Sequence, residues 1–254
     1  MFEPLDLYCE RCDPSFWAEP FNAFSNFAFV IAAVAVWWRG RRQTQKGLAG
    51  GRIAHPALPW PVAGLVVLAG LVAIGSALFH TFATRWAMVL DVAPILVFQV
   101  WFLWFYLRIV PRLSRRWGTV SCTLFLAAHG LVMLFPRDLN GPAWFNGSLN
   151  YLPTLLVLGG LGLYQVQTQT RLPYRMLGIF TAFALAVSLR TVDLWICEWF
   201  PVGTHFAWHL INGVVFFLSI DLLQQQFVLT PTGWIADGPA GDADSLNESE
   251  NKSR

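Results

Sequence analysis

Seven apolar stretches separated by short polar connections make up most of the chain. Each is close to the roughly 20 residues that an α-helix needs to cross the hydrocarbon core of a bilayer. Trp and Tyr residues cluster at several of their ends, as they do at membrane–water interfaces. The pattern therefore predicts an all-α polytopic membrane protein, a bundle of seven transmembrane helices. The expected spans are Asn22–Trp38, Pro61–His80, Trp86–Leu107, Thr119–Phe135, Leu149–Gln165, Tyr174–Ile196 and His205–Phe227.

The composition agrees with this class of protein. Hydrophobic residues make up 56% of the chain and charged residues 13%, about half the charged fraction of a soluble domain. The net charge of +2 is too small to indicate a nucleic-acid partner. Met1–Trp17 carries four acidic residues and lacks the apolar core of a secretory signal, so the first span is expected to stay in the mature protein.

The distribution of Lys and Arg predicts the orientation of the bundle. Eleven of these residues lie in the connections after the first, third and fifth spans, against three on the opposite side. Because cytoplasmic loops carry an excess of positive charge, we expect the N-terminus outside and the C-terminus in the cytoplasm.

This orientation gives three segments. Residues 1–21 form an outer N-terminal segment, residues 22–228 the transmembrane domain, and residues 229–254 a cytoplasmic tail. The tail is rich in Gly, Asp, Glu, Ser and Asn and has little apolar content, so we expect it to be disordered.

Five polar side chains stand out because the predicted topology places them at one depth in the membrane. Ser76 and His80 lie near the outer end of the second span, and Asp91 lies about a turn into the third. His205 and His209 begin the seventh span on the same side. Ionisable groups at membrane depth are costly and usually face the bundle interior, where they find a partner.

These five residues suggest a catalytic metal site. His205 and His209 are four residues apart, so they share one helix face and can bind one zinc ion together. With His80 they make three imidazole ligands and leave a fourth position for water. Asp91 is the candidate general base. The Ser76 hydroxyl would donate to the developing oxyanion or orient the water.

Simpler interpretations remain open for single residues. A lone His at a helix end is most often an interfacial or hydrogen-bonded residue. Ser76 next to Gly75 fits a small residue at a helix–helix contact, and Asp91 would also be satisfied by an arginine.

Other polar residues predict structural roles. Arg190 and Asp193, three residues apart in the sixth span, suggest an ion pair. His55 and His129 have no evident partner, and we interpret both as structural. Cys9–Cys12 has the CxxC spacing, but no second pair supports a zinc ribbon or a redox motif.

The pattern Ser76-x3-His80-x10-Asp91, followed by His205-x3-His209, resembles that of the alkaline ceramidases. This family belongs to a wider superfamily of seven-helix membrane hydrolases that includes adiponectin-receptor-like proteins. The resemblance covers about residues 8–220. It implies an amide hydrolase that splits ceramide into a sphingoid base and a fatty acid, with the three histidines as zinc ligands, Asp91 as base and Ser76 as the oxyanion-stabilising or water-orienting hydroxyl.

The N-terminal stretch adds to the resemblance. Tyr8–Cys9–Glu10 and the later Glu19-x-x-Asn22-x-x-Ser25-Asn26 are similar to the family's acidic segment before its first helix. The family also has a calcium ion there, and the chain departs from its pattern at Leu7 and Cys12, where an aspartate and an asparagine are expected. Asp6 or Asp13 is the candidate substitute; alternatively, these acids only solvate the surface. The implied calcium ligands are Glu10, Glu19, Asp13 and the backbone carbonyl of Tyr8.

The predicted topology also suggests a disulfide. Cys9 and Cys197 both lie on the outer side near the expected site, so they can pair in an oxidising compartment. Cys122 lies near the cytoplasmic face and is expected to be free.

Two other functions stay open. One is a hydrolase of the same superfamily that acts on another acyl lipid, and the other is a non-enzymatic receptor or transporter that uses the same zinc site. A transporter should show broken helices in paired repeats, and none is evident in the sequence. The expected partner is a membrane lipid in the bilayer, with no nucleic acid, and the oligomeric state is open. A bacterial inner membrane is favoured, or the endoplasmic reticulum or Golgi membrane in a eukaryote.

Overall fold

The computed structural model describes residues 3–49, 56–134, 145–170, 172–230 and 233–236. Within them, seven helical spans are long and apolar enough to cross a membrane, as the hydrophobic pattern predicts. The first span is divided at Asn26 into two helices. The α-helices are α1 (Pro20–Ser25), α2 (Phe27–Ala49), α3 (Trp60–Phe82), α4 (Arg85–Ile109), α5 (Arg115–Leu134), α6 (Leu152–Thr168), α7 (Arg175–Val192) and α8 (His205–Gln224). Two 3-10 turns, η2 (Ser148–Tyr151) and η3 (Asp193–Trp195), precede α6 and follow α7.

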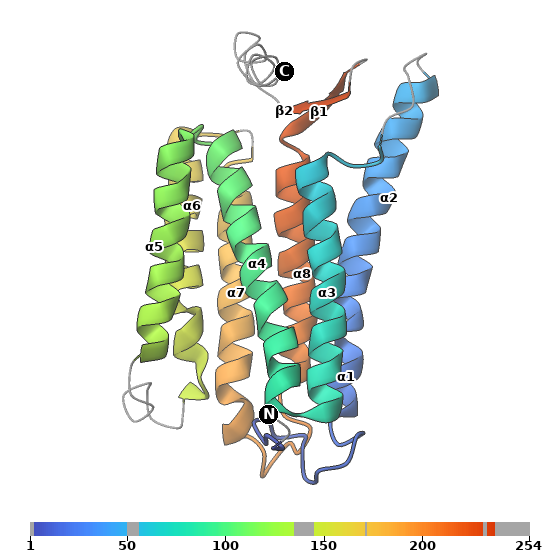
Figure 1. The fold of residues 1–254 in the computed structure, drawn as a ribbon, viewed down its shortest axis with the longest axis vertical. Helices are drawn as coiled ribbons and strands as arrows, with labels where there is room; N and C mark the ends of the chain where they lie inside the picture. The colour runs from blue at the N-terminus through green and yellow to red at the C-terminus, as the bar shows by residue number, and fades with distance from the viewer. Residues whose placement is uncertain (1–2, 50–55, 135–144, 171, 231–232, 237–254) are drawn as a thin grey trace.

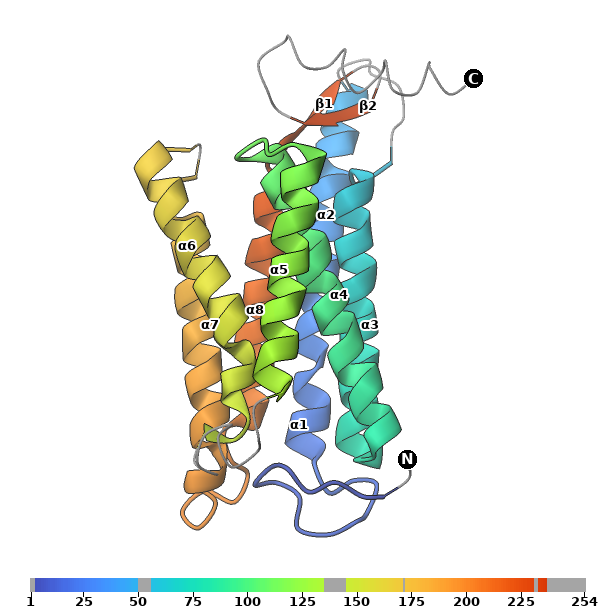
Figure 2. The same ribbon diagram turned by 60° about the vertical axis from the view of Figure 1, so that its left-hand side comes forward.

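The helices run side by side, with α8 in the middle of the bundle (Figures 1 and 2). Helix α8 packs against α2, α3, α4 and α7 and is the most buried of the seven spans. The close approach to α2 depends on Gly213, where a Cβ atom would lie 2.6 Å from the Cβ of Ala28. Any residue on the buried face of α8 is therefore surrounded by protein rather than lipid.

The N-terminal segment, residues 3–19, crosses one end of the bundle (Figure 1). The Leu5 amide donates to the Ala83 carbonyl at 2.7 Å, which ties the segment to the turn between α3 and α4. A disulfide joins Cys9 to Cys197, in the connection between α7 and α8, with a Cα–Cα distance of 5.2 Å. The segment is thus tied to both sides of the bundle.

The opposite end carries a hairpin that the sequence pattern did not predict. Strands β1 (Phe227–Thr230) and β2 (Gly233–Ala236) are antiparallel and place Val228 opposite Ile235 and Leu229 opposite Trp234. The expectation of disorder from residue 229 is therefore wrong for this stretch, because cross-strand apolar pairs stabilise the hairpin. Residues 237–254 of the expected tail lie outside the described residues.

Several helix ends also differ from the expected spans. Helix α2 continues to Ala49 rather than stopping near Trp38. Arg, Gln, Lys and Ala are good helix formers, so hydropathy does not mark where such a helix ends. Arg39 in this extension forms an ion pair with Asp221 of α8 at 2.7 Å, which holds the extension against the bundle.

The contact between α3 and α4 generates the first prediction. A Cβ atom on Gly75 would collide with the Leu90 backbone carbonyl, whereas one on Gly70 would meet nothing within 4 Å. We expect Gly75→Ala to cost about 1–3 kcal/mol of stability, because overpacking forces the two backbones apart. Gly70→Ala should be neutral or slightly stabilising. Thermal unfolding of both variants in detergent micelles tests this, and equal losses would show that the contact is not tight.

Candidate metal centre

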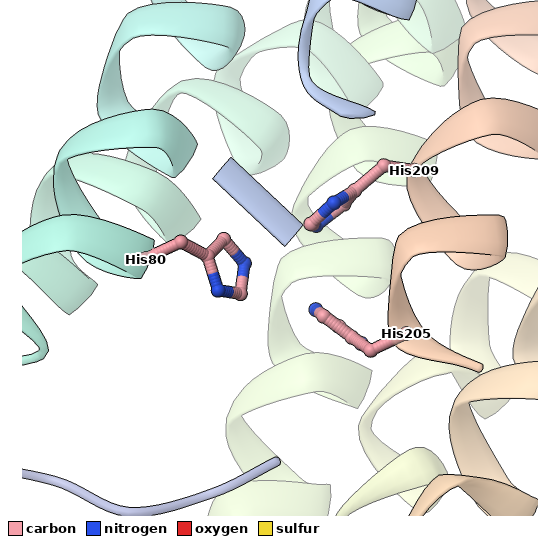
Figure 3. A group of neighbouring side chains, drawn as sticks. All are labelled: His80, His205 and His209. Atoms are coloured by element: carbon pink, nitrogen blue, oxygen red, sulfur yellow. The ribbon is translucent and has the colours of Figure 1, made fainter. Parts of the chain in front are cut away.

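Three histidines meet inside the bundle near the end that carries the N-terminal segment. His80 comes from α3, and His205 and His209 come from the first turns of α8 (Figure 3). All three are buried, and each offers a nitrogen atom within 4.8 Å of those of the other two. The predicted convergence of these residues, more than a hundred positions apart in the chain, is confirmed.

The state of the ring nitrogens fits a metal ion. Nε2 of His80 and Nδ1 of His205 are buried and have no hydrogen-bond partner. An unsatisfied polar atom in a buried site costs roughly 1–3 kcal/mol, which coordination of a cation would remove. Three neutral imidazoles suit Zn²⁺ and several other transition metals, so the donor set fits a metal site without identifying the metal.

A carboxylate holds the first histidine in place. Nδ1 of His80 lies 2.5 Å from Oε2 of Glu19, and Nδ2 of Asn22 donates to the same oxygen at 3.1 Å. Burial alone raises the pKa of Glu19, but the bonds from His80, Arg11 and Asn22 outweigh it and hold the pKa below its ordinary value. A metal-binding histidine commonly donates its second ring nitrogen to a carboxylate in this way. Nε2 of His80 is then left as the ligand atom.

A serine orients the second histidine. The Ser25 hydroxyl donates to the Asn22 carbonyl at 2.8 Å, and its oxygen lies 2.7 Å from Nδ1 of His209. With the single hydroxyl proton placed on the Asn22 carbonyl, Nδ1 of His209 is the donor in this contact. This network assigns the Nδ1-protonated tautomer and leaves Nε2 of His209 free to bind a metal.

The third histidine is held through its ring and its backbone. The Tyr8 ring stacks on the His205 ring with centroids 3.7 Å apart. The His205 amide donates to Asp193 at 2.9 Å, and the same carboxylate accepts the amides of Thr204 at 2.7 Å and Cys9 at 3.1 Å. Asp193 therefore satisfies backbone amides at the start of α8 and links this end of the helix to the N-terminal segment.

This role of Asp193 corrects the expected ion pair with Arg190. Within the described part of the chain, no salt bridge joins these two residues. Arg190 instead donates to the Tyr8 hydroxyl at 3.0 Å and lies over the rings of Tyr8 and Tyr151. The spacing rule fails because the α-helix ends at Val192, and η3 turns the Asp193 carboxylate toward the start of α8.

Ser76 and Asp91 lie next to the histidines but outside their ligand group. Ser76 is buried one helical turn before His80, and its hydroxyl is within hydrogen-bonding reach of the Asp91 carboxylate near the start of α4. Asp91 is not part of the converging set of ligand atoms. The catalytic roles assigned to Ser76 and Asp91 stay predictions.

The structure does not assemble the implied calcium ligands. Glu10 accepts the amides of Phe21 and Asn22 at 2.6 and 2.8 Å; burial raises its pKa, and these two bonds partly offset the effect. Asp13 accepts the Ser15 amide at 2.7 Å. Among the described His, Cys, Asp and Glu side chains, the three histidines are the one converging group of three or more. Calcium binding by these residues stays a prediction, and in this structure the Glu10 and Asp13 carboxylates accept backbone amides.

The other described histidine and the two free cysteines are not part of this centre. His55 lies outside the described residues. Nδ1 of His129 lies 3.0 Å from the Phe125 carbonyl one turn earlier in α5. Cys12 and Cys122 are free, the first exposed and the second buried.

The sequence reasoning missed the residues that support the histidines. Glu19 was assigned to calcium, and Ser25 and Arg11 received no role. A signal was present, because Glu19, Asn22 and Ser25 are three residues apart and fall on one face at the start of the first span. All three are buried, so this polar stripe faces the bundle and not the lipid.

Comparison with known proteins assigns no family to the chain. No family model matches it, and no curated protein matches it. What the centre does must therefore be argued from its own residues.

The support that Glu19 gives to His80 generates a prediction. Glu19→Gln keeps the shape of the side chain but removes its charge. Its NH₂ group would also face either Arg11 or His80, both of which are hydrogen-bond donors here. We expect affinity for added Zn²⁺ to fall about 10- to 100-fold, as for other residues that orient metal ligands. Competition with a chromophoric chelator measures this.

Glu198→Gln is the matched control, because Glu198 is exposed in the connection before α8. Its Zn²⁺ affinity should equal that of the unchanged protein. Full affinity in Glu19→Gln would mean that the carboxylate does not orient the ligand.

Proposed function

We propose that the chain is a zinc-dependent intramembrane amide hydrolase, most specifically a ceramidase that releases a sphingoid base and a free fatty acid. The observation that carries the proposal is the buried group of His80, His205 and His209, with Asp91 and Ser76 beside it. Three histidine ligands with an open position are typical of catalytic rather than structural zinc. The resemblance of the Ser76–Asp91 and His205–His209 patterns to alkaline ceramidases favours an amide of a long-chain base.

Each polar residue has a distinct role in this hydrolysis. Bound Zn²⁺ would supply a Lewis acid that polarises the carbonyl and lowers the pKa of a water molecule to about 7. Asp91 accepts a proton from the attacking water and delivers it to the leaving nitrogen as the carbon–nitrogen bond breaks. Ser76 donates a hydrogen bond to the carbonyl oxygen as negative charge develops, or holds Asp91 in position.

The place of the centre suits a lipid substrate. It lies near one end of apolar helices, where the head group of an amphiphile can reach it while the acyl chains stay in hydrocarbon. An aromatic cluster adjoins it, since the Trp208 ring lies 6.4 Å from the His205 ring and also lies 4.7 Å from Tyr151 and 5.9 Å from Phe183. These rings, from η2, α7 and α8, are candidates for contacts with an acyl chain.

The proposed orientation puts the N-terminus and the metal centre on the outer side and the C-terminus in the cytoplasm. Two independent features support it. Basic residues are concentrated in the connections at the other end of the bundle. The Cys9–Cys197 disulfide lies at the end of the bundle that carries the centre, and disulfides persist in oxidising compartments. A bacterial inner membrane is favoured, with the endoplasmic reticulum or Golgi membrane as the eukaryotic counterpart.

The roles of ligand and base can be separated by two variants. His209→Ala should lose both Zn²⁺ and hydrolysis. Asp91→Asn should keep Zn²⁺ while hydrolysis falls at least about 100-fold, because general acid–base catalysis contributes roughly 10²–10⁴. Fatty acid released from ceramide by purified protein, together with metal content, measures both properties.

His129→Ala is the control, because His129 lies on α5 away from the three-histidine group. It should retain Zn²⁺ and activity. Loss of Zn²⁺ from Asp91→Asn would make Asp91 a ligand rather than the base.

A panel of ceramides, other acyl amides and phospholipid esters distinguishes a ceramidase from a hydrolase of another lipid. Bound Zn²⁺ without turnover of any of them would indicate a receptor or transporter and overturn the proposal.

A further inference from the structure

A single buried cation organises the N-terminal segment beside the metal centre. The Arg11 side chain is 4% exposed, and its Nε lies 2.5 Å from Oε1 of Glu19. Its Nη1 donates to the Asp13 and Ser15 carbonyls at 3.2 and 3.3 Å, and its Nη2 donates to the His80 carbonyl at 3.2 Å. One carboxylate oxygen and three backbone carbonyl oxygens therefore surround the guanidinium.

Carboxylate and backbone carbonyl oxygens are also the donors that proteins offer to Ca²⁺, which takes roughly six to eight of them. In this chain the negative charge of this oxygen set is already balanced, because the positive charge of Arg11 pairs with the Glu19 carboxylate. The family resemblance predicts calcium ligands here, but Leu7 and Cys12 stand where two of them are expected, and both are exposed. Glu10 is bonded to backbone amides instead. A calcium ion would add two positive charges next to a buried guanidinium that already occupies Oε1 of Glu19.

We propose that the Arg11 guanidinium takes the place of Ca²⁺ in this protein and positions the metal ligand His80 through Glu19. The two oxygens of the Glu19 carboxylate have different partners. Oε1 accepts a hydrogen bond from Nε of Arg11, and Oε2 lies against Nδ1 of His80. Arg11 also holds the backbone of His80 directly through its carbonyl. His80 is thus held at its ring by Glu19 and at its backbone carbonyl by Arg11. Because Glu19 is itself bonded to Arg11, both contacts depend on one guanidinium.

The shape of the side chain matters as much as its charge. A guanidinium presents donors in a planar fork, so it reaches four acceptors in different directions. A lysine ammonium carries the same charge as a point with three donors. An uncharged side chain of similar length would leave the Glu19 carboxylate buried with part of its partners missing. Arg11→Lys, which keeps the charge, should therefore disturb the site less than Arg11→Met, which removes it.

The first experiment tests replacement of calcium. Zinc-loaded protein is titrated with Ca²⁺ to about 5 mM, above the dissociation constants of roughly 10⁻⁴–10⁻³ M seen for weak protein sites. Isothermal calorimetry and thermal unfolding should show no binding and no shift in Tm. Stoichiometric binding of Ca²⁺ with a rise in Tm would overturn the proposal, whether or not the protein hydrolyses ceramide.

The second experiment tests positioning. Arg11→Met should lower Zn²⁺ affinity about 10- to 100-fold, and Arg11→Lys should restore part of it because the charge is kept but the fork is lost. Affinity is measured by chelator competition at a temperature where every variant is folded. A purely structural role would lower Tm in Arg11→Met and leave the Zn²⁺ affinity of the folded protein unchanged, which would contradict the proposal.

Arg85→Met is the matched control. Arg85 lies at the same end of the bundle and pairs with Glu3 at 3.6 Å, but both side chains are exposed. Exposed pairs contribute about 0–1 kcal/mol, so neither Tm nor Zn²⁺ affinity should change appreciably. The positioning role rests on the proposed metal centre, but its readout is affinity and not turnover. A protein that binds Zn²⁺ without hydrolysing lipid still gives a decisive result for Arg11.

Discussion

The buried carboxylate of Glu19 is the constraint on which the rest of the centre depends. An ionised carboxylate in a protein interior is tolerated only when charged and hydrogen-bonding partners surround it. Here the partners come from three directions: Arg11 in the N-terminal segment, Asn22 in α1 and His80 in α3. Satisfying this one group therefore fixes three parts of the chain relative to one another.

A second carboxylate does the same on the other side of the centre. Asp193 accepts three backbone amides, one from the N-terminal segment and two from the start of α8. The disulfide and the stacking of Tyr8 on His205 link the same parts again. His80 and His205 are thus held from outside the bundle by one short segment, in addition to the packing of α3 against α8, whereas His209 is held by Ser25 of α1. Helix packing alone would fix the depth of the imidazoles but not the direction of their nitrogens.

The parts of this arrangement that could be predicted are those with a local signal. Hydropathy revealed the seven spans, and the spacing of His205 and His209 revealed two of the three histidines. The supporting contacts join residues 61 positions apart for Glu19 and His80, and 184 for Ser25 and His209, so no periodicity shows them. Local rules also gave a wrong prediction. The i,i+3 spacing of Arg190 and Asp193 suggested an ion pair, but the Asp193 carboxylate accepts backbone amides at the start of α8 instead. Polar composition suggested disorder where the Leu229–Trp234 pair stabilises a hairpin.

A guanidinium and a calcium ion can both be surrounded by carboxylate and carbonyl oxygens, but they differ in one physical respect. An ion dissociates, so the geometry it supports depends on its concentration, whereas Arg11 is covalently part of the segment that it holds. Its positioning of Glu19 is completed when the chain folds and needs no further binding equilibrium. The cost is that the guanidinium must be desolvated during folding, which its contacts with Glu19 and three carbonyls offset. On this reasoning the orientation of His80 is a property of the fold and is independent of calcium concentration.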